Sequence, residues 1–183
     1  MATFDARVRA TGLVVTAGQL RRDIEAGAPL SDDLVAIGSS GPLPTPVQQA
    51  LDQLSRTERG VPTLRDLAVG FETLDTDILA HRRGQGSWFS LGGVFSDDNP
   101  ERASRDRVRA LAAEGRFSEV ADMLERSEWA ELSKRWITQV RLHADSVIAG
   151  QLVMAHALAA YEASQTTPPS WPQATSSTGR VSQ

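Results

Sequence analysis

Residues 128–161, EWAELSKRWITQVRLHADSVIAGQLVMAHALAAY, are the stretch that decides the predicted fold. Apolar residues recur along it at roughly helical spacing, and charged pairs four residues apart, such as Glu131 with Arg135 and Arg141 with Asp145, suit an exposed helix surface. The apolar set that we expect to be buried is Trp129, Leu132, Trp136, Val140, Val147, Leu152 and Ala155. These residues predict one long helix that belongs to a helical bundle.

Two helical patterns and a hairpin precede this long helix. Residues 63–83 carry an apolar stripe at spacings of three and four: Leu64, Leu67, Ala68, Phe71, Leu74 and Ile78. A helix beginning at Asn99-Pro100 and ending at Gly115 is followed by a second arm with Phe117, Val120, Ala121 and Leu124 on one side. The sequence therefore predicts a helix-Gly-helix hairpin packed into a C-terminal bundle.

The first sixty residues predict further helices, at residues 4–26, near residues 31–37 and from Thr45, where Thr45 to Gln48 reads as a capping box. No stretch alternates as a strand would. We predict an all-α fold of six to seven helices, divided into an N-terminal helical segment (1–60), a helical domain (61–165) with an apolar insert (84–98), and a disordered Thr/Ser/Pro-rich tail (166–183).

Composition narrows the class of protein. The chain has 183 residues, enough for one domain with a core, and its 40% apolar and 23% charged residues are ordinary globular values. A net charge of −4 with dispersed lysines and arginines argues against nucleic-acid binding. The absence of cysteine excludes disulfides, thiolate catalysis and cysteine-based zinc sites. The longest uncharged run near the N-terminus is too short for a spanning helix, and we identify no signal sequence or anchor.

The apolar insert is the candidate binding site. Residues 87–96, SWFSLGGVFS, are uncharged and rich in aromatics, and two arginines stand just before them. Such residues are either buried at the top of a helical bundle, or they contact a membrane or a partner. The candidate membrane- or partner-binding residues are Arg82, Arg83, Trp88, Phe89, Leu91, Val94 and Phe95.

Catalytic and metal-binding patterns are weak by comparison. His143 and His156 are too far apart on one helix to share a ligand, and His81 stands beside two arginines. The acidic pairs at residues 75 and 77 and at 97 and 98 lack the further ligands and the fixed glycine of a calcium loop. We therefore expect no cofactor, no metal and no enzymatic activity, with a reaction at His81 and neighbouring carboxylates as a distant possibility.

Four ordered stretches resemble the C-terminal part of the alphaproteobacterial mitofilin family. Residues 20–30, LRRDIEAGAPL, resemble the family's helix–glycine–proline turn, and residues 60–67, GVPTLRDL, followed by Phe71, resemble its GVPT signature. Residues 110–117, ALAAEGRF, resemble its hairpin, and Trp136 with Arg141 resembles its closing helix. The resemblance spans residues 10–163 and rests on the order and spacing of the four stretches.

The resemblance implies a non-enzymatic membrane-organising scaffold on the periplasmic face of the bacterial inner membrane. In mitofilins the segment between the signature helix and the hairpin binds lipid, and residues 87–95 occupy that position here. The implied partner is an anionic membrane surface, contacted peripherally. The family's upstream transmembrane helix and coiled coil are missing here, so we expect a fragment or a shortened member, with homo-oligomers possible through that coiled coil. The alternative is a soluble helical adaptor that docks a protein partner through the same insert.

Overall fold

The computed structural model describes residues 2–57, 59–86 and 100–166, and within these ranges every regular element is an α-helix. The seven helices are α1 (Ala2–Ala26), α2 (Ser31–Gly38), α3 (Thr45–Ser55), α4 (Leu64–Gly86), α5 (Pro100–Ala113), α6 (Phe117–Glu125) and α7 (Ala130–Thr166). The predicted all-α class and the hairpin of α5 and α6 are therefore confirmed. The disordered tail expected at 166–183 lies outside the described residues, apart from Thr166, which ends α7.

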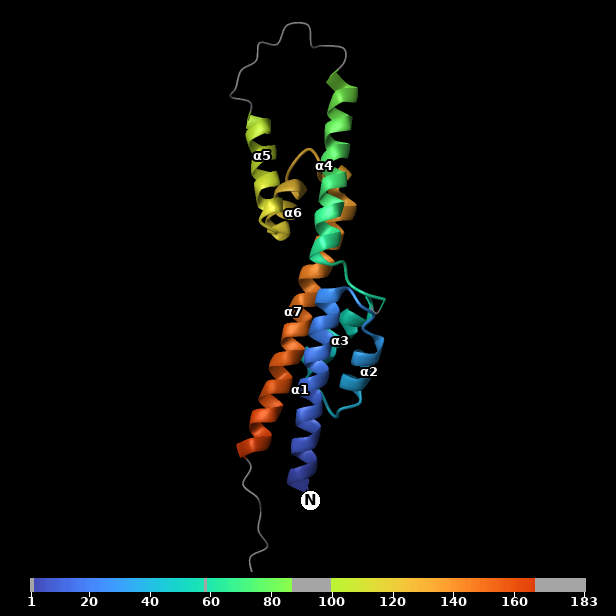
Figure 1. Ribbon diagram of the computed structural model, residues 1–183, viewed down its shortest axis with the longest axis vertical. Coiled ribbons are helices and arrows are strands. Elements are labelled where there is room, and N and C mark those ends of the chain that lie inside the picture. The colour runs from blue at the N-terminus through green and yellow to red at the C-terminus, as the bar shows by residue number, and fades with distance from the viewer. Residues whose placement is uncertain (1, 58, 87–99, 167–183) are drawn as a thin grey trace, which may run out of the picture.

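Helix α7 runs along most of the elongated molecule (Figure 1). Its C-terminal half lies antiparallel to α1, and its N-terminal half lies antiparallel to α4, so that α1 and α4 follow one another along the same side of α7. Helices α2 and α3 pack near the α1 end, and α5 and α6 pack near the α4 end. The long helix predicted from residues 128–161 is thus the element to which both halves of the molecule are attached.

Two hydrophobic cores lie along α7. The first, here called the α4–α6 core, contains Leu67, Phe71, Leu74, Ile78, Val108, Leu111, Ala112, Phe117, Val120, Ala121, Leu124, Trp136, Ile137 and Val140. The second, the α1–α3 core, contains Leu13, Ala17, Leu20, Ile24, Leu30, Ile37, Val47, Ala50, Leu54, Val61, Ala149, Val153 and Ala157. The stripes predicted for α4 and the hairpin are buried as expected, except for Ala68, which is partly buried, and Leu64, which is exposed.

The buried face of α7 matches the predicted one only in part: Trp136 and Val140 are buried as expected, and Trp129 and Val147 are partly buried. Leu132 and Leu152 were expected in the core, but they are 43% and 40% exposed, and Ala155 is exposed as well. Small residues are buried in their place, including Ser133, Ser146 and Gly150. A Cβ at Gly150 would lie 2.8 Å from Ile24 Cδ1, which shows how closely α1 and α7 approach. Small side chains permit this approach, and larger ones are left on the outer surface.

The junction between the two halves is formed by backbone contacts. A Cβ at Gly60 would lie 2.5 Å from the carbonyl oxygen of Gly27, and the φ of Gly60 is 122°, a conformation that strongly favours glycine. Beside it, His143 Nδ1 lies 2.7 Å from the carbonyl oxygen of Pro62. These contacts hold the end of α1, the start of α4 and the middle of α7 together.

Helix α4 begins with a capping box that was not predicted from the sequence. The Thr63 backbone N–H donates to Asp66 Oδ2 at 2.9 Å, and the Asp66 backbone N–H donates to Thr63 Oγ1 at 3.1 Å. The predicted box at Thr45 is wrong, because Pro44 is the N-cap of α3 and no side chain caps that helix. At its other end, α4 continues to Gly86, three residues beyond the predicted end at Arg83.

Candidate functional site

Two of the seven predicted site residues lie at the end of α4. Arg82 and Arg83 belong to the last turns of this helix, although the placement of their side chains is not described. The remaining predicted residues, Trp88, Phe89, Leu91, Val94 and Phe95, lie outside the described residues. Their predicted contact with a membrane or a partner therefore stays a prediction. The described helices nearest to them in the sequence are α4 and α5.

A pocket of about 370 Å³ lies between α4, α5 and the turn that joins α6 to α7. Its apolar lining comes from Phe71, Ile78, Val108, Met123, Leu124 and Trp129. Its polar lining comes from Asp75, Ser104, Arg105, Ser127 and Glu128. A cavity of this size, mostly apolar and with a few polar groups, is typical of a ligand site, and we call it the α4–α5 pocket.

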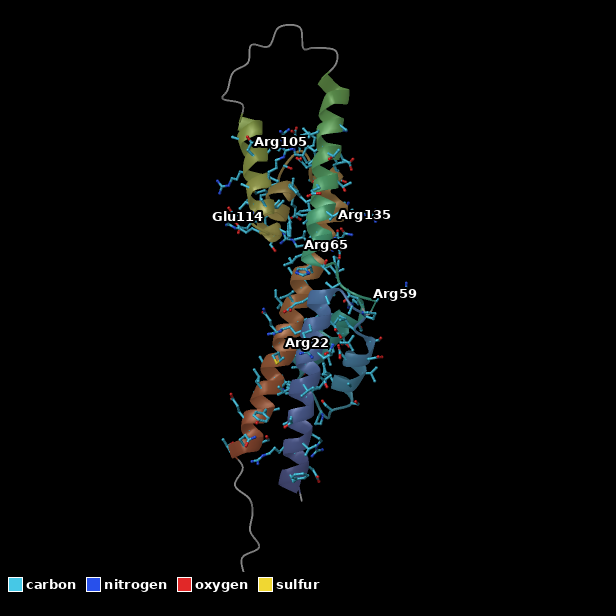
Figure 2. The ribbon with its side chains drawn as sticks, in the orientation of Figure 1. Arg22, Arg59, Arg65, Arg105, Glu114 and Arg135 are labelled. Atoms are coloured by element: carbon cyan, nitrogen blue, oxygen red, sulfur yellow. The ribbon has the colours of Figure 1, made fainter. Side chains whose placement is uncertain are left out.

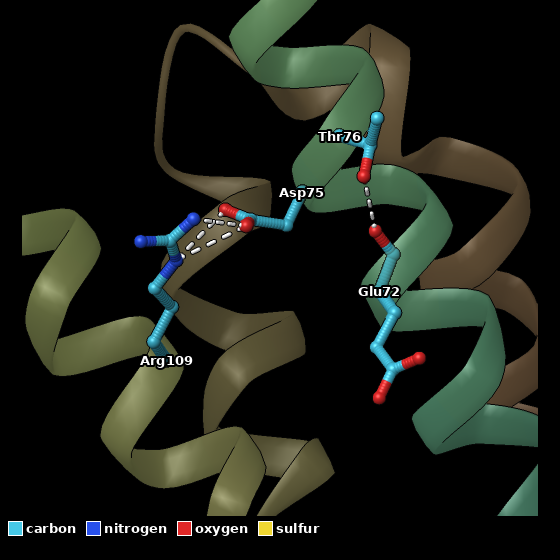
Figure 3. A network of polar contacts seen from close by, with 4 residues as sticks. All are labelled: Glu72, Asp75, Thr76 and Arg109. Atoms are coloured by element: carbon cyan, nitrogen blue, oxygen red, sulfur yellow. Dashed lines mark hydrogen bonds and ion pairs between the residues drawn. The ribbon is translucent and has the colours of Figure 1, made fainter.

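An ion pair between Asp75, which lines the pocket, and Arg109, which does not, joins α5 to α4. Arg109 Nε donates to both carboxylate oxygens of Asp75, at 3.1 Å and 3.0 Å, and a guanidinium Nη of the same arginine also contacts Asp75 (Figure 3). The side chain of Asp75 is only 17% exposed and that of Arg109 is 40% exposed. The hydrogen bonds to the Asp75 carboxylate raise the pKa of Arg109.

Arg105 lies one turn before Arg109 on α5 and lines the same pocket (Figure 2). Its Nε is buried and has no hydrogen-bond partner within the described part of the chain. A charged donor is costly to bury without an acceptor, and most buried polar groups in proteins have a partner. Arg105 is therefore the polar group of the pocket that a ligand could satisfy.

The turn before α7 contributes an aromatic side chain, that of Trp129, to the lining of the pocket. Trp129, at the turn before α7, is partly buried against the α4–α6 core, and the ring of His81 meets it edge-on with 6.3 Å between centroids. Ser127 orients this turn, because its Oγ accepts a hydrogen bond from the Trp129 backbone N–H at 3.1 Å. His81 thus serves as a ring neighbour of Trp129 beside the pocket.

The described residues contain no candidate metal site, because no three or more histidines, aspartates or glutamates among them are grouped so that they could hold an ion. Asp75, considered in the sequence as half of an acidic pair with Asp77, is held by an arginine instead. Asp33 and Asp23 approach one another between α1 and α2, and burial together with the neighbouring Asp23 raises the pKa of Asp33 to about 6. This pair lies in the other half of the molecule and is not part of the pocket.

Arg105 and Met123, which line the pocket, and Arg109, which holds Asp75, are not among the site residues predicted from the sequence. Arg105 and Arg109 are four residues apart and flank Val108, so a pair of arginines beside an apolar stripe was the one available signal. The partner of Arg109 is 34 residues away in the sequence, and only the packing of α4 against α5 brings the two together.

Comparison of the chain with models of protein families, with curated proteins and with solved structures gave no match.

Proposed function

We propose that the chain is a non-enzymatic scaffold domain of the mitofilin type that contacts an anionic membrane surface peripherally at the end of α4. The observation that carries the proposal is the position of Arg82 and Arg83 on the last turns of α4, immediately before the uncharged aromatic sequence 87–96. In Figure 1, α4 reaches the end of the molecule opposite the N-terminus. A cationic helix end next to aromatic residues is what peripheral binding to anionic lipid requires.

The distribution of charge supports the same end of the molecule. Residues 81–107 contain five arginines and four carboxylates, a net charge of +1, whereas the whole chain carries −4. The remainder of the chain is therefore acidic and repelled by an anionic surface, so that an approach with the α4 end first is favoured. None of the helices in the described ranges is long and apolar enough to cross a membrane.

The expected attachment is weak and needs two contributions. Two or three inserted side chains contribute about 1.5–3 kcal/mol each, and each arginine near the surface adds about 1 kcal/mol. Neither contribution alone offsets the cost of association. Loss of either the aromatic or the cationic group should therefore abolish measurable binding.

Co-sedimentation of the purified chain with vesicles tests the proposal. We compare anionic with neutral vesicles, at low and high salt, for the wild type, for Trp88→Ser/Phe89→Ser and for Arg82→Glu/Arg83→Glu. We expect the wild type to bind only anionic vesicles and both double variants to fail, with the salt dependence carried mainly by the arginines.

Matched controls come from the N-terminal end of α1. Phe4→Ser/Val8→Ser removes exposed apolar side chains, and Arg7→Glu/Arg9→Glu makes the same charge change on exposed arginines, both at the opposite end of the molecule. Both controls should bind as the wild type does. If the wild type does not bind anionic vesicles, the membrane proposal is wrong and docking of a protein partner through the apolar insert becomes the leading function.

A further inference from the structure

We propose that the α4–α5 pocket binds a small amphipathic monocarboxylate, a molecule with an unbranched apolar chain and one terminal carboxylate, with the carboxylate held by Arg105. This binding function is separate from the proposed membrane contact and does not depend on it. It rests on three features of the described residues: an apolar cavity, one buried guanidinium N–H without a partner, and the local charge balance.

The apolar feature is the shape and lining of the cavity. Its volume of about 370 Å³ is within the range of small-molecule sites, and its walls come from α4, α5, α6 and the turn before α7. Ile78 and Val108 provide aliphatic walls, and Phe71 and Trp129 provide aromatic ones. An apolar chain that enters this space leaves water and gains contacts on several sides.

The polar feature is the Nε of Arg105. This atom is buried and unpartnered among the described residues, in a side chain that lines the cavity. The planar guanidinium group matches a carboxylate, which can accept two parallel hydrogen bonds from it. A bound carboxylate would supply the acceptor that Arg105 lacks.

The charge balance selects a single negative charge. Asp75 is paired with Arg109, which does not itself line the pocket. The guanidinium of Arg105 and the exposed Glu128 are then the other charged lining groups. A monoanion can pair with Arg105 at little cost from Glu128. A doubly charged phosphate would lose more hydration free energy than a singly charged carboxylate on entering this mostly apolar cavity, so a monocarboxylate is the better ligand.

The test uses decanoate as the probe, with decanol as an uncharged molecule of the same chain length. Dissociation constants are measured by two-dimensional NMR in vesicle-free buffer, below the concentration at which decanoate forms micelles. We expect decanoate to shift the resonances of pocket residues, including the Trp129 indole N–H, and to bind at least about tenfold more tightly than decanol, the value of one hydrogen bond to a charged group.

Three variants locate the site. Arg105→Gln should lose the preference for decanoate over decanol, because the charge is removed while a donor of similar length stays. Arg107→Gln is the matched control, since Arg107 is an exposed arginine on the same helix that does not line the pocket, and it should keep the preference. Ser104→Trp places a large ring at the exposed rim of the pocket and should weaken both probes.

A second readout is independent of affinity. With decanoate labelled with carbon-13 at the carboxyl group, pairing with Arg105 should lower the pKa of the bound carboxylic acid relative to the free acid, and this shift should vanish in Arg105→Gln. Equal binding of decanoate and decanol, or an unchanged preference in Arg105→Gln, overturns the proposal. Binding that occurs only after Trp88, Phe89 and Phe95 are replaced by serine also overturns it, because the chain itself would then be the occupant.

Discussion

Replacement of Trp136 by alanine should destabilise the protein more than any other single aromatic truncation in the α4–α6 core. The Trp136 side chain is 4% exposed, its indole N–H donates to the carbonyl oxygen of Leu67 at 2.9 Å, and its ring packs against Phe71 and Phe117 with centroid distances of 5.6 Å and 6.0 Å. It therefore connects α7 to α4 and to α6 at once.

The expected cost follows from these contacts. Truncation of a buried tryptophan to alanine costs about 3–5 kcal/mol through lost burial and the cavity left behind. The hydrogen bond and the two ring contacts each contribute about 1 kcal/mol, which places the value near the top of that range. Trp136→Phe keeps most of the ring contacts and loses the donor, so it should cost only about 1–2 kcal/mol.

Urea unfolding followed by far-ultraviolet circular dichroism measures these differences without relying on tryptophan fluorescence. Leu132→Ala is the matched control, because it truncates an apolar residue one turn earlier on the same helix that is 43% exposed, and it should cost less than about 1 kcal/mol. A loss below about 1 kcal/mol in Trp136→Ala at unchanged m-value, or an equal loss in Leu132→Ala, would refute the assignment of the buried face of α7.

Two further predictions concern the junction and the α1–α3 core. Gly60→Ala should lower the free energy of unfolding by about 1–3 kcal/mol from its backbone conformation alone, and by more because the new Cβ would clash with the carbonyl oxygen of Gly27. Gly115→Ala is the control, because Gly115 has a φ of 74° but no atom within 4 Å of its Cβ position. It should cost less in the same urea titration. Because the pKa of Asp33 is raised to about 6 in the folded protein, it binds more protons folded than unfolded, so stability should fall as pH rises from about 4 to about 6. Asp33→Asn should remove that part of the pH dependence and stabilise the protein at pH 7 by up to about 3 kcal/mol. If this variant leaves the pH profile of the melting temperature unchanged, the raised pKa of Asp33 is contradicted.

The short amphipathic helices could be predicted from the sequence almost completely. All four residues predicted to be buried on α6, Phe117, Val120, Ala121 and Leu124, are buried. A helix of this length packs one face against one core, so the 3.6-residue period alone identifies that face. The same reasoning identified Leu67, Phe71, Leu74 and Ile78 as core residues of α4, and the helical patterns together identified the all-α class.

The candidate site could be predicted only in part. The sequence pointed to the end of α4, but the α4–α5 pocket depends on Arg105, Asp75 and Trp129, which come from three separate elements. A sequence pattern reports neighbours along one helix, and it does not report which arginine of α5 will face which carboxylate of α4.

The sequence by itself determined where the helices lie and which face of each short helix is apolar, because periodicity and terminal signals act locally. The sequence also placed Trp136 and Val140 on the buried face of α7. Only the tertiary structure decided the rest of that face, because this helix packs against α4 and α6 in one half and against α1 and α3 in the other. It also decided the partners of Arg141, which pairs with Asp122 and with Glu125 of α6 rather than with the predicted Asp145. Close approach of α1 and α7 requires small residues at the contact, so Gly150 is buried while Leu152 is not.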